Sequence, residues 1–165
     1  MEENVSRSAH YLRRAIQWLI VIGVIALLSV GVFNIIQQQL RPKQMIAIGN
    51  TSVQAEVVDT PEARAKGLSG RSSISSGEGM LFVFGEDKEW AIWMKGMKFP
   101  IDIVWLDSDK KVVHLAENIQ PDAEPYVEYK PPLPTRYVLE LQAGKVKQAD
   151  IRIGAQVNFD LDRGK

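Results

Sequence analysis

Residues 101–109 read IDIVWLDSD, an apolar segment of strand length that ends in three turn-forming residues. β-branched and aromatic side chains favour extended structure, whereas Asp and Ser favour turns. A second apolar segment follows at residues 111–117, so the pattern predicts a β-hairpin. Further strands, separated by turn residues, are predicted at residues 53–57, 80–84, 91–94, 137–141 and 156–161.

The succession of short strands predicts a mainly β fold, because the strands do not alternate with long helices. We expect a compact β-sandwich or barrel-like domain with one or two short helices. One helix is predicted at residues 61–66, where Thr60 can cap the N-terminus and Gly67 can end the last turn. Residues 144–149 can form a second, single helical turn.

A long apolar segment precedes the β-rich part. Residues 15–36 read AIQWLIVIGVIALLSVGVFNII and contain no charged side chain. A helix rises 1.5 Å per residue, so about 20 residues cross the roughly 30 Å hydrocarbon core of a bilayer. The length and composition therefore predict a single transmembrane helix.

A cleaved signal peptide is the alternative interpretation of this segment. Small residues at Ser29 and Gly31 follow a basic N-terminal region, as they do at signal cleavage sites. The apolar stretch continues to Ile36, however, and exceeds the usual h-region of about 7–15 residues. This extra length favours a retained anchor.

The predicted helix divides the chain into four parts. They are an N-terminal cytoplasmic segment at residues 1–14, the transmembrane helix at 15–36, a polar linker at 37–44 and a soluble β domain at 45–165. Three basic residues precede the helix and two follow it, so the positive-inside rule favours a cytoplasmic N-terminus by one residue. These five are Arg7, Arg13, Arg14, Arg41 and Lys43. The expected location is the cytoplasmic membrane, crossed once, with the β domain extracytoplasmic.

Composition excludes several classes of site. Lys and Arg total 20 and Asp and Glu total 20, so no basic excess suggests a nucleic-acid partner. The absence of Cys excludes disulfides, thiolate nucleophiles and Cys-ligated zinc, and only His10 and His114 could supply imidazole. The glycines near residues 67 and 77–79 lack the spacing of phosphate- or dinucleotide-binding loops. We therefore expect neither a metal nor a cofactor.

Three segments of the β domain carry a family resemblance. They read GMLFVF at residues 79–84, WMKGMKFPIDIVWL at 93–106 and PTRYVLELQAG at 134–144. Together with residues 59–71, they follow the order of the prokaryotic domain of unknown function 192, which the chain resembles over residues 53–159. The resemblance implies a compact β-sandwich-like domain that is commonly carried behind a signal or membrane segment. It implies no established activity.

The chain departs from the family pattern in its proline-rich loop. Many members carry a Cys pair there, whereas residues 120–126 read QPDAEPY. Five prolines between residues 120 and 134 predict an extended surface loop. A mechanism that relies on those thiols cannot operate here, so prolines and packing must hold the loop.

Asp102 stands out because the alternation of its strand places it with Val104 and Leu106 on an apolar face. A buried carboxylate needs a partner, since an unpaired one is strongly destabilised or protonated. The candidate partners are Arg71, Lys95 and Arg136. Asp102 is therefore either half of an internal ion pair that fixes the fold or an acid in a pocket.

Glu140 presents the same ambiguity on the strand at residues 137–141, where it shares a face with Val138 and Gln142. Two acids on neighbouring strands can act as a glycosidase-like pair when their carboxyl groups lie about 5–9 Å apart. The sequence does not supply that distance. Asp102 and Glu140 are thus a possible acidic pair whose geometry the structure must test.

Aromatic and thioether side chains are concentrated between residues 90 and 105. Such side chains bind flat apolar faces or sugar rings, although most of them pack in cores. Several lie on a predicted loop at residues 95–99, which favours binding, and Lys95 and Lys98 could meet an anionic ligand or solubilise the loop. The complete set of candidate pocket residues is Arg71, Trp93, Met94, Lys95, Met97, Phe99, Asp102, Arg136 and Glu140.

Three functions fit these features. The first is a membrane-tethered, non-enzymatic binding or accessory domain of the cell envelope, which contacts the lipid bilayer through residues 15–36 and an unknown small ligand or envelope protein through the pocket residues. The second is an envelope hydrolase that uses Asp102 and Glu140. The third is a structural domain that docks another protein. The sequence favours the first and assigns no catalytic residue.

Overall fold

The structure is a computed structural model that describes residues 2–39, 41–121, 125 and 127–161. The chain consists of two units, Met1–Arg41 and Pro42–Lys165. The division falls close to the boundary that hydropathy predicts between the apolar segment and the β domain.

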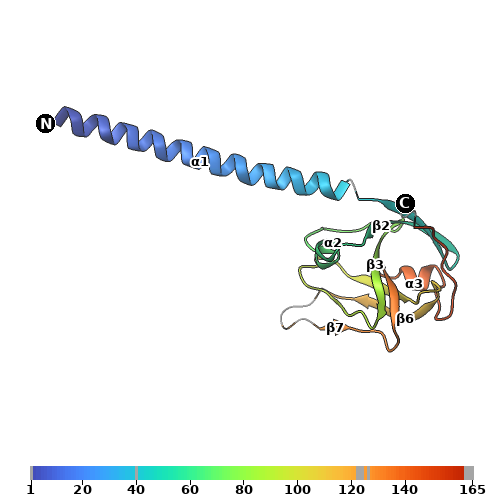
Figure 1. Cartoon of the computed structure of the whole chain (residues 1–165). Helices are drawn as coiled ribbons and strands as arrows, with labels where there is room; N and C mark the ends of the chain where they lie inside the picture. Colours follow the sequence, from blue (N-terminus) through green and yellow to red (C-terminus); the bar gives the residue numbers. More distant parts are fainter. Residues whose placement is uncertain (1, 40, 122–124, 126, 162–165) are drawn as a thin grey trace. The chain divides into compact units, whose positions relative to one another are not determined.

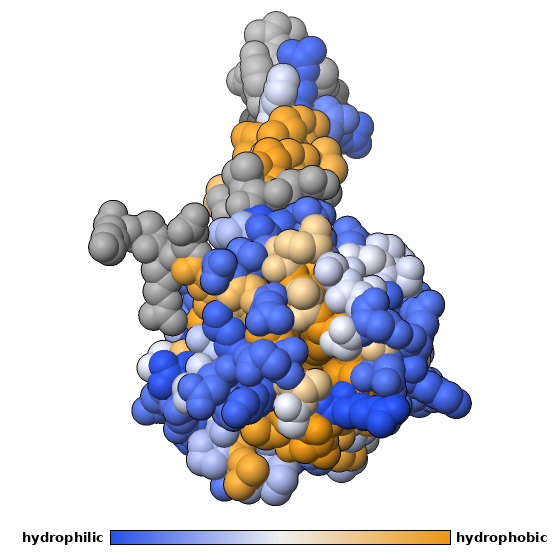
Figure 2. Space-filling model, turned by 90° about the vertical axis from the view of Figure 1, so that its right-hand side faces the viewer, coloured by the Kyte–Doolittle hydropathy of each residue, from blue (hydrophilic) through white to orange (hydrophobic). Residues whose placement is uncertain are grey.

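The first unit contains a single helix, α1 (Glu2–Gln39). Its residues Ile16–Phe33 have a mean hydropathy of 2.5, none of them is buried, and they form the orange band of the helix in Figure 2. Eighteen apolar residues are enough to cross a hydrocarbon core. The described part of the chain therefore has one N-terminal helix with the length and composition of a membrane anchor or a signal sequence.

The connection after α1 is shorter than the linker expected at residues 37–44. The helix continues through Gln39, because Gln is a good helix former, and the first strand begins at Lys43. Only residues 40–42 separate the two elements.

The second unit is built on a mixed six-stranded sheet with the strand order β1-β2-β3-β8-β5-β6 (Figure 1). Its strands are β1 (Lys43–Ile48), β2 (Thr51–Val58), β3 (Glu78–Lys88), β5 (Ile101–Leu106), β6 (Val112–Ile119) and β8 (Thr135–Gln142). A separate pair consists of β4 (Ile92–Trp93) and β7 (Glu128–Tyr129), and the short helices are α2 (Pro61–Lys66) and α3 (Lys145–Gln148). Strands β2 and β3 pair in parallel, with α2 in their connection, and the other neighbours pair antiparallel.

The C-terminal segment closes the sheet into a barrel. Ala47 of β1 and Asn158 exchange two backbone hydrogen bonds of 2.9 Å. On the other side of the same segment, Val112 at the start of β6 donates to the carbonyl oxygen of Ala155, and Val157 donates to that of Lys110, both over 3.0 Å. Residues 154–158 thus connect the two edge strands, and closure removes edges that could otherwise pair with another chain.

Alternation along the strands sends apolar side chains to both faces of this barrel. The interior cluster draws on all six strands and the C-terminal segment, with Leu81, Val104 and Leu139 at its centre. The second cluster lies on the outer face of β3, β8 and β5, where Phe82, Ile103 and other side chains pack beneath α2, β4 and the residues that follow them. The outer cluster positions the candidate site, because a pocket opens between the sheet and this cover.

Most of the predicted elements are confirmed. The hairpin is formed by β5 and β6, and both short helices are present. The strand predicted at residues 91–94 shrinks to β4, and the closing strand predicted at 156–161 is reduced to isolated bridges to the two barrel edges. The proline-rich loop contains β7, while residues 122–124 and 126 of it lie outside the described residues.

Candidate functional site

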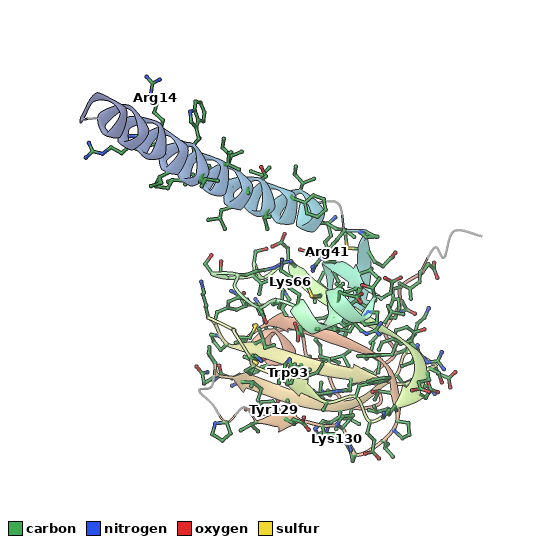
Figure 3. All side chains as sticks on the ribbon, turned by 60° about the vertical axis from the view of Figure 1, so that its left-hand side comes forward. Arg14, Arg41, Lys66, Trp93, Tyr129 and Lys130 are labelled. Carbon is green, nitrogen blue, oxygen red and sulfur yellow. The ribbon has the colours of Figure 1, made fainter. Side chains whose placement is uncertain are left out.

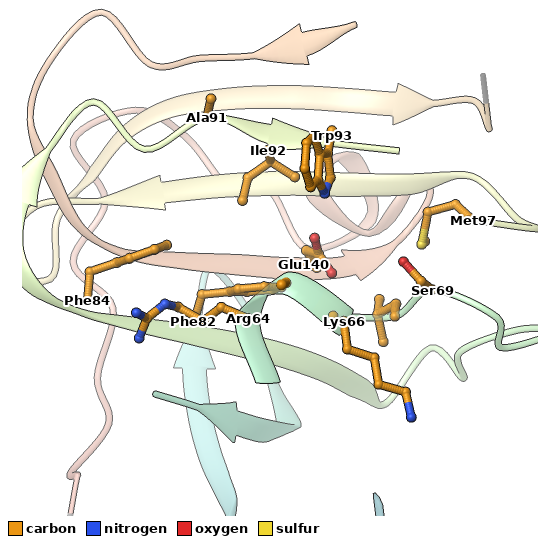
Figure 4. Close-up of a pocket in the computed structure, with 13 residues that line it drawn as sticks. Arg64, Lys66, Ser69, Phe82, Phe84, Ala91, Ile92, Trp93, Met97 and Glu140 are labelled. Atoms are coloured by element: carbon orange, nitrogen blue, oxygen red, sulfur yellow. The ribbon is translucent and has the colours of Figure 1, made fainter. Parts of the chain in front are cut away.

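A pocket with a volume of about 180 Å³ opens between the outer face of the barrel and its cover (Figure 4). Strands β3 and β8 form one side of it, and α2, β4 and the segment after α2 form the other. The side chains that line it are Arg64, Ala65, Lys66, Leu68, Ser69, Phe82, Phe84, Ala91, Ile92, Trp93, Met97 and Glu140.

Local sequence fixes α2 at the mouth of the pocket. Thr60 caps the helix, since its hydroxyl oxygen accepts a 3.2 Å hydrogen bond from the backbone N–H of Ala63. Gly67 ends the helix at φ +48°, and its N–H donates to the carbonyl oxygen of Ala63 over 2.9 Å. A Cβ atom at Gly67 would also approach the ring of Phe82 to 3.3 Å. The helix can therefore lie directly on the aromatic floor.

Two further contacts tie the cover together. The hydroxyl group of Ser69 donates a 2.7 Å hydrogen bond to the carbonyl oxygen of Lys95, and the N–H of Gly70 donates to that of Gly96 over 2.9 Å. These bonds join the segment after α2 to the loop after β4. The two halves of the cover are thus held at a fixed separation over the sheet.

Aromatic side chains form one wall. Phe84 stacks on Trp90 with ring centroids 4.1 Å apart and planes inclined by 11°. The guanidinium group of Arg64 lies 5.0 Å from the centroid of the Phe84 ring and donates a hydrogen bond of 2.9 Å to the carbonyl oxygen of Val83. Arg64 is thereby anchored to the wall.

Trp93 stands at the opening of the pocket and is 48% exposed. It lies on β4, beside the β7 strand that carries Tyr129 (Figure 3). The ammonium group of Lys95 lies 5.7 Å from the centroid of the Trp93 ring. A large aromatic surface is thus available to a ligand at the entrance.

Glu140 lies on the inner side of the pocket, on β8, between Met80 of β3 and Ile103 of β5. The residue is only 5% exposed, and its Oε2 atom has no hydrogen-bond partner among the described residues. Burial raises the pKa of Glu140 to about 8, and the positive charge of Arg71 opposes this rise only in part. Glu140 is therefore mostly protonated at pH 7 and places a neutral carboxyl group in the pocket.

Arg71 forms its strongest contacts with a different acid. Its two terminal nitrogens donate 2.7 Å hydrogen bonds to the two carboxylate oxygens of Glu56 on β2. This is a bidentate, partly buried ion pair, the strongest geometry available to Arg. Arg71 acts on Glu140 through its charge from that position.

Asp102 lies on the other face of the barrel wall. Its Oδ1 atom accepts a 2.8 Å hydrogen bond from the N–H of Asn118 on β6, and its Oδ2 atom accepts a 2.8 Å bond from the N–H of Val146 in α3. Asn118 has a φ of +51°, an uncommon conformation that this contact helps to hold. Asp102 therefore connects three elements of the fold and has a structural role.

The predicted cationic partners of Asp102 are wrong. Arg71 binds Glu56, Arg136 binds Asp87 and Lys95 lies over Trp93. Backbone N–H groups take the place of a cation, because the bulge of β6 and the first turn of α3 bring two donors to the carboxylate.

The acidic pair of the hydrolase hypothesis is also wrong. Directly opposed residues of an antiparallel pair share a face, and Glu140 is opposed by Ile103 whereas Asp102 is opposed by Leu141. Asp102 and Glu140 are thus on opposite faces of the barrel wall, with β-sheet between them. They cannot flank one glycosidic bond.

A match to a family model shows the family to which this chain belongs. Residues 44–159 match the domain of unknown function 192, described as an uncharacterized ACR. The chain belongs to this family. The DUF192 match begins within β1 and ends in the segment that closes the barrel, so it covers nearly all of the β-rich unit.

Two solved structures resemble the DUF192 domain. One is a Sinorhizobium meliloti protein described as a candidate transcription regulator, with 29% identity and a TM-score of 0.67 over 72% of this chain and 95% of that chain. The other is a Novosphingobium aromaticivorans protein of unknown function, with 26% identity and a TM-score of 0.62 over 72% of this chain and 84% of that chain. No curated protein matches the sequence significantly. The fold is thus shared, and the molecular function of the family is uncharacterised.

The DUF192 pocket contains three of the nine residues that the sequence proposed, namely Trp93, Met97 and Glu140. Met94 is fully buried, and Phe99 packs against the outer cluster. The sequence prediction missed the α2 contribution and the aromatic wall, which include Arg64, Lys66, Ser69, Phe82 and Phe84. Alternation in the run at residues 80–84 could have placed Phe82 and Phe84 on one face, but it could not show what covers that face.

Among the residues that the structure describes, no group of three or more His, Cys, Asp or Glu side chains could hold a metal ion. Glu140 is the single acid among those that line the pocket. The arrangement is suited to binding a ligand through apolar surface and one buried polar contact.

Proposed function

We propose that this DUF192 domain is a membrane-tethered binding or accessory module of the cell envelope, and that a small ligand enters the pocket beside Glu140. One observation carries this proposal: the Oε2 atom of Glu140 is buried with no hydrogen-bond partner among the residues that the structure describes, and its side chain lines a cavity. Buried polar atoms in proteins are nearly always hydrogen-bonded. A ligand in the pocket would supply the missing partner.

The features of the pocket favour binding over catalysis. Hydrolysis by carboxylates needs a second acid in reach, and none of the described residues supplies one to this cavity. The hydroxyl group of Ser69 also donates to the backbone carbonyl of Lys95 and not to a side chain that could activate it as a nucleophile. A docking role has less support, because the exposed large apolar side chains of the β-rich unit lie on separate elements. They are Met45, Trp93, Val127, Leu133 and Ile153.

The membrane part of the proposal rests on α1. A retained helix at residues 15–36 would tether the β-rich unit to the bilayer, since three residues separate α1 from β1. The surplus of basic residues before the helix favours a cytoplasmic N-terminus and an extracytoplasmic β-rich unit.

The absence of Cys allows a direct test of this topology. Single-cysteine variants Ser6→Cys and Ser108→Cys place one thiol on each side of the apolar segment at residues 15–36, and Ser108 is exposed in the β5–β6 turn. In spheroplasts, a membrane-impermeant maleimide should label Ser108→Cys at once and Ser6→Cys only after permeabilisation. The reverse pattern would place the β-rich unit in the cytoplasm, and a shortened, soluble product would show that the segment is a cleaved signal peptide.

A thermal-shift screen of the full chain in lipid nanodiscs tests the pocket. A ligand at ten times its Kd adds about 1.4 kcal/mol to the free energy of unfolding, so its Tm rises. We expect stabilising compounds to lose most of their effect on Trp93→Ala, which removes the exposed ring at the entrance. The matched control is Leu133→Ala, which truncates a similarly exposed side chain that does not line the pocket. If no compound stabilises the chain, or if all act equally on Trp93→Ala, the pocket is not the binding site.

A further inference from the structure

The two segments that cover the pocket carry an excess of positive charge, although Glu128 of β7 lies opposite Trp93. Residues 60–74 and 90–99, which form the cover, contain five Lys and Arg residues and one acid, Glu62. Arg71 is neutralised by Glu56, and Arg64 is held on the wall by backbone carbonyls and the Phe84 ring. A basic surround raises the local concentration of anions and lowers that of cations.

Lys66 is the cation at the rim that is available to a ligand. Its stem lines the pocket, its side chain is exposed, and its ammonium group has no hydrogen-bond or ion-pair partner among the described residues. In Figure 4 the side chain extends from α2 with its ammonium group directed away from Glu140. A long, flexible ammonium at this position can approach a negative group that projects from the opening.

The deep end of the pocket has the opposite character. Glu140 lies there among Phe82, Ile92 and Met97, and as a neutral carboxyl group it can donate one hydrogen bond. An ionised Glu140 at this depth would repel an anionic ligand, whereas its neutral carboxyl group can donate a hydrogen bond to that ligand. Donation to a ligand oxygen would also pair the Oε2 atom, which has no partner within the described part of the chain.

The dimensions limit the ligand to about one ring. A volume of 180 Å³ is below the roughly 300–1,000 Å³ of sites for drug-sized molecules. The exposed face of Trp93 at the entrance suits the flat side of a sugar or an aromatic ring. The size of the pocket therefore favours a compact ring, and the positive charges at its rim favour a negatively charged substituent on that ring.

We propose, on the basis of the binding function above, that the pocket takes a ring-sized organic carboxylate, with the neutral carboxyl group of Glu140 donating a hydrogen bond to a ligand oxygen and Lys66 meeting its negative charge. The ring is either that of a sugar acid or that of an aromatic acid. Both share the carboxylate, the flat face and an oxygen acceptor.

The experiment measures binding by saturation-transfer NMR to the full chain in nanodiscs of zwitterionic lipid. The probes are D-glucuronate, benzoate and benzyltrimethylammonium, whose charges do not change between pH 6 and pH 9. Because the pKa of Glu140 is about 8, about a tenth of its carboxyl groups stay protonated at pH 9. The wild-type chain should therefore bind glucuronate, benzoate or both about tenfold more weakly at pH 9 than at pH 6.

Three variants separate the hydrogen bond from other pH effects. Arg71, Glu56, Arg64, Lys66 and Lys95 also surround the pocket, and they remain in every variant. Glu140→Gln keeps a donor that does not titrate, so its affinity for the anion should be the same at both pH values. Glu140→Leu removes the donor and should bind at least tenfold more weakly at pH 6, while Leu133→Ala should behave as wild type.

Each remaining outcome decides the proposal. If benzyltrimethylammonium binds in preference, and binds more tightly at pH 9, Glu140 acts as a carboxylate for cations; the ligand class is then wrong although the pocket still binds ligands. If anion binding is equally strong at both pH values in the wild-type chain, the hydrogen bond from Glu140 is excluded. If none of the three probes binds at either pH, the ligand class is wrong, and the thermal-shift screen with Trp93→Ala decides separately whether the pocket binds any ligand.

Discussion

Replacement of Glu140 by Gln is expected to stabilise the β-rich unit by about 3 kcal/mol at pH 7. The ordinary pKa of this carboxyl group is 4.5 and burial raises it to about 8 in the fold. Between these values the unfolded chain releases the proton while the folded chain keeps it, so the stability of the wild-type chain falls as pH rises. One pH unit corresponds to about 1.4 kcal/mol, and Gln has no such dependence.

Urea unfolding of the full chain in detergent, followed by Trp fluorescence at pH 4.5 and pH 7, measures this effect. The variant and the wild type should have similar free energies of unfolding at pH 4.5 and should diverge at pH 7. Glu117→Gln makes the same change on an exposed part of β6 and should alter stability by no more than about 0.5 kcal/mol. A Glu140→Gln variant that is less stable than wild type at pH 7 would show that the carboxylate is ionised and paired.

If this prediction is correct, Glu140 lowers the stability of the fold at pH 7. Proteins accept such local conflicts mainly where a site requires them, and a perturbed carboxyl group in a cavity is a recognised mark of function. The carboxyl group would lower the free energy of unfolding of the β-rich unit and would strengthen the binding of a ligand. The same variant thus links the two measurements, since Glu140→Gln should be more stable and still bind the anion.

Much of the fold could be predicted because local patterns specify it. The run at residues 80–84 and the turn at 107–109 produce β3 and the β5–β6 hairpin, and Thr60 produces the cap of α2. The sequence predicts a closing strand at residues 156–161, but its two partners could not be predicted in this way, because the segment forms isolated bridges to edges that lie far from it in sequence. The segment is short and irregular, so its hydrophobic pattern does not indicate the strands with which it pairs.

The site could not be predicted from the sequence, because the pattern within one strand does not show which residues of a neighbouring strand share its face. Alternation placed Asp102 with Val104 and Glu140 with Val138, and the structure confirms both assignments. Whether Asp102 and Glu140 lie on the same face depends on the register between β5 and β8, and a shift of one residue would place them on one face. Sequence patterns within each strand do not contain that register. The contribution of α2 was missed for a related reason, because Lys66 reaches the pocket only through the packing of its helix on the outer cluster.

The same chemical change in the other buried acid, Asp102→Asn, is expected to destabilise the β-rich unit by about 3 kcal/mol. Both carboxylate oxygens of Asp102 accept backbone hydrogen bonds, and the residue is 0% exposed. An amide group retains one acceptor and turns a second donor toward a backbone N–H, so one charge-assisted bond is lost and a buried donor is left unpaired. Urea unfolding at pH 7 measures the loss, with the exposed Asp109→Asn as its control.

The opposite signs of the two substitutions distinguish their roles. A structural acid whose bonds are complete loses stability when its charge is removed, whereas an acid without a partner gains it. A neutral Asp102→Asn variant would mean that α3 and the bulge of β6 do not depend on this carboxylate. If Asp102→Asn and Glu140→Gln changed stability in the same direction, the two buried acids could not have the different environments that the register of β5 and β8 gives them. Opposite signs would leave Glu140 as the one of these two buried acids that is free to bind a ligand.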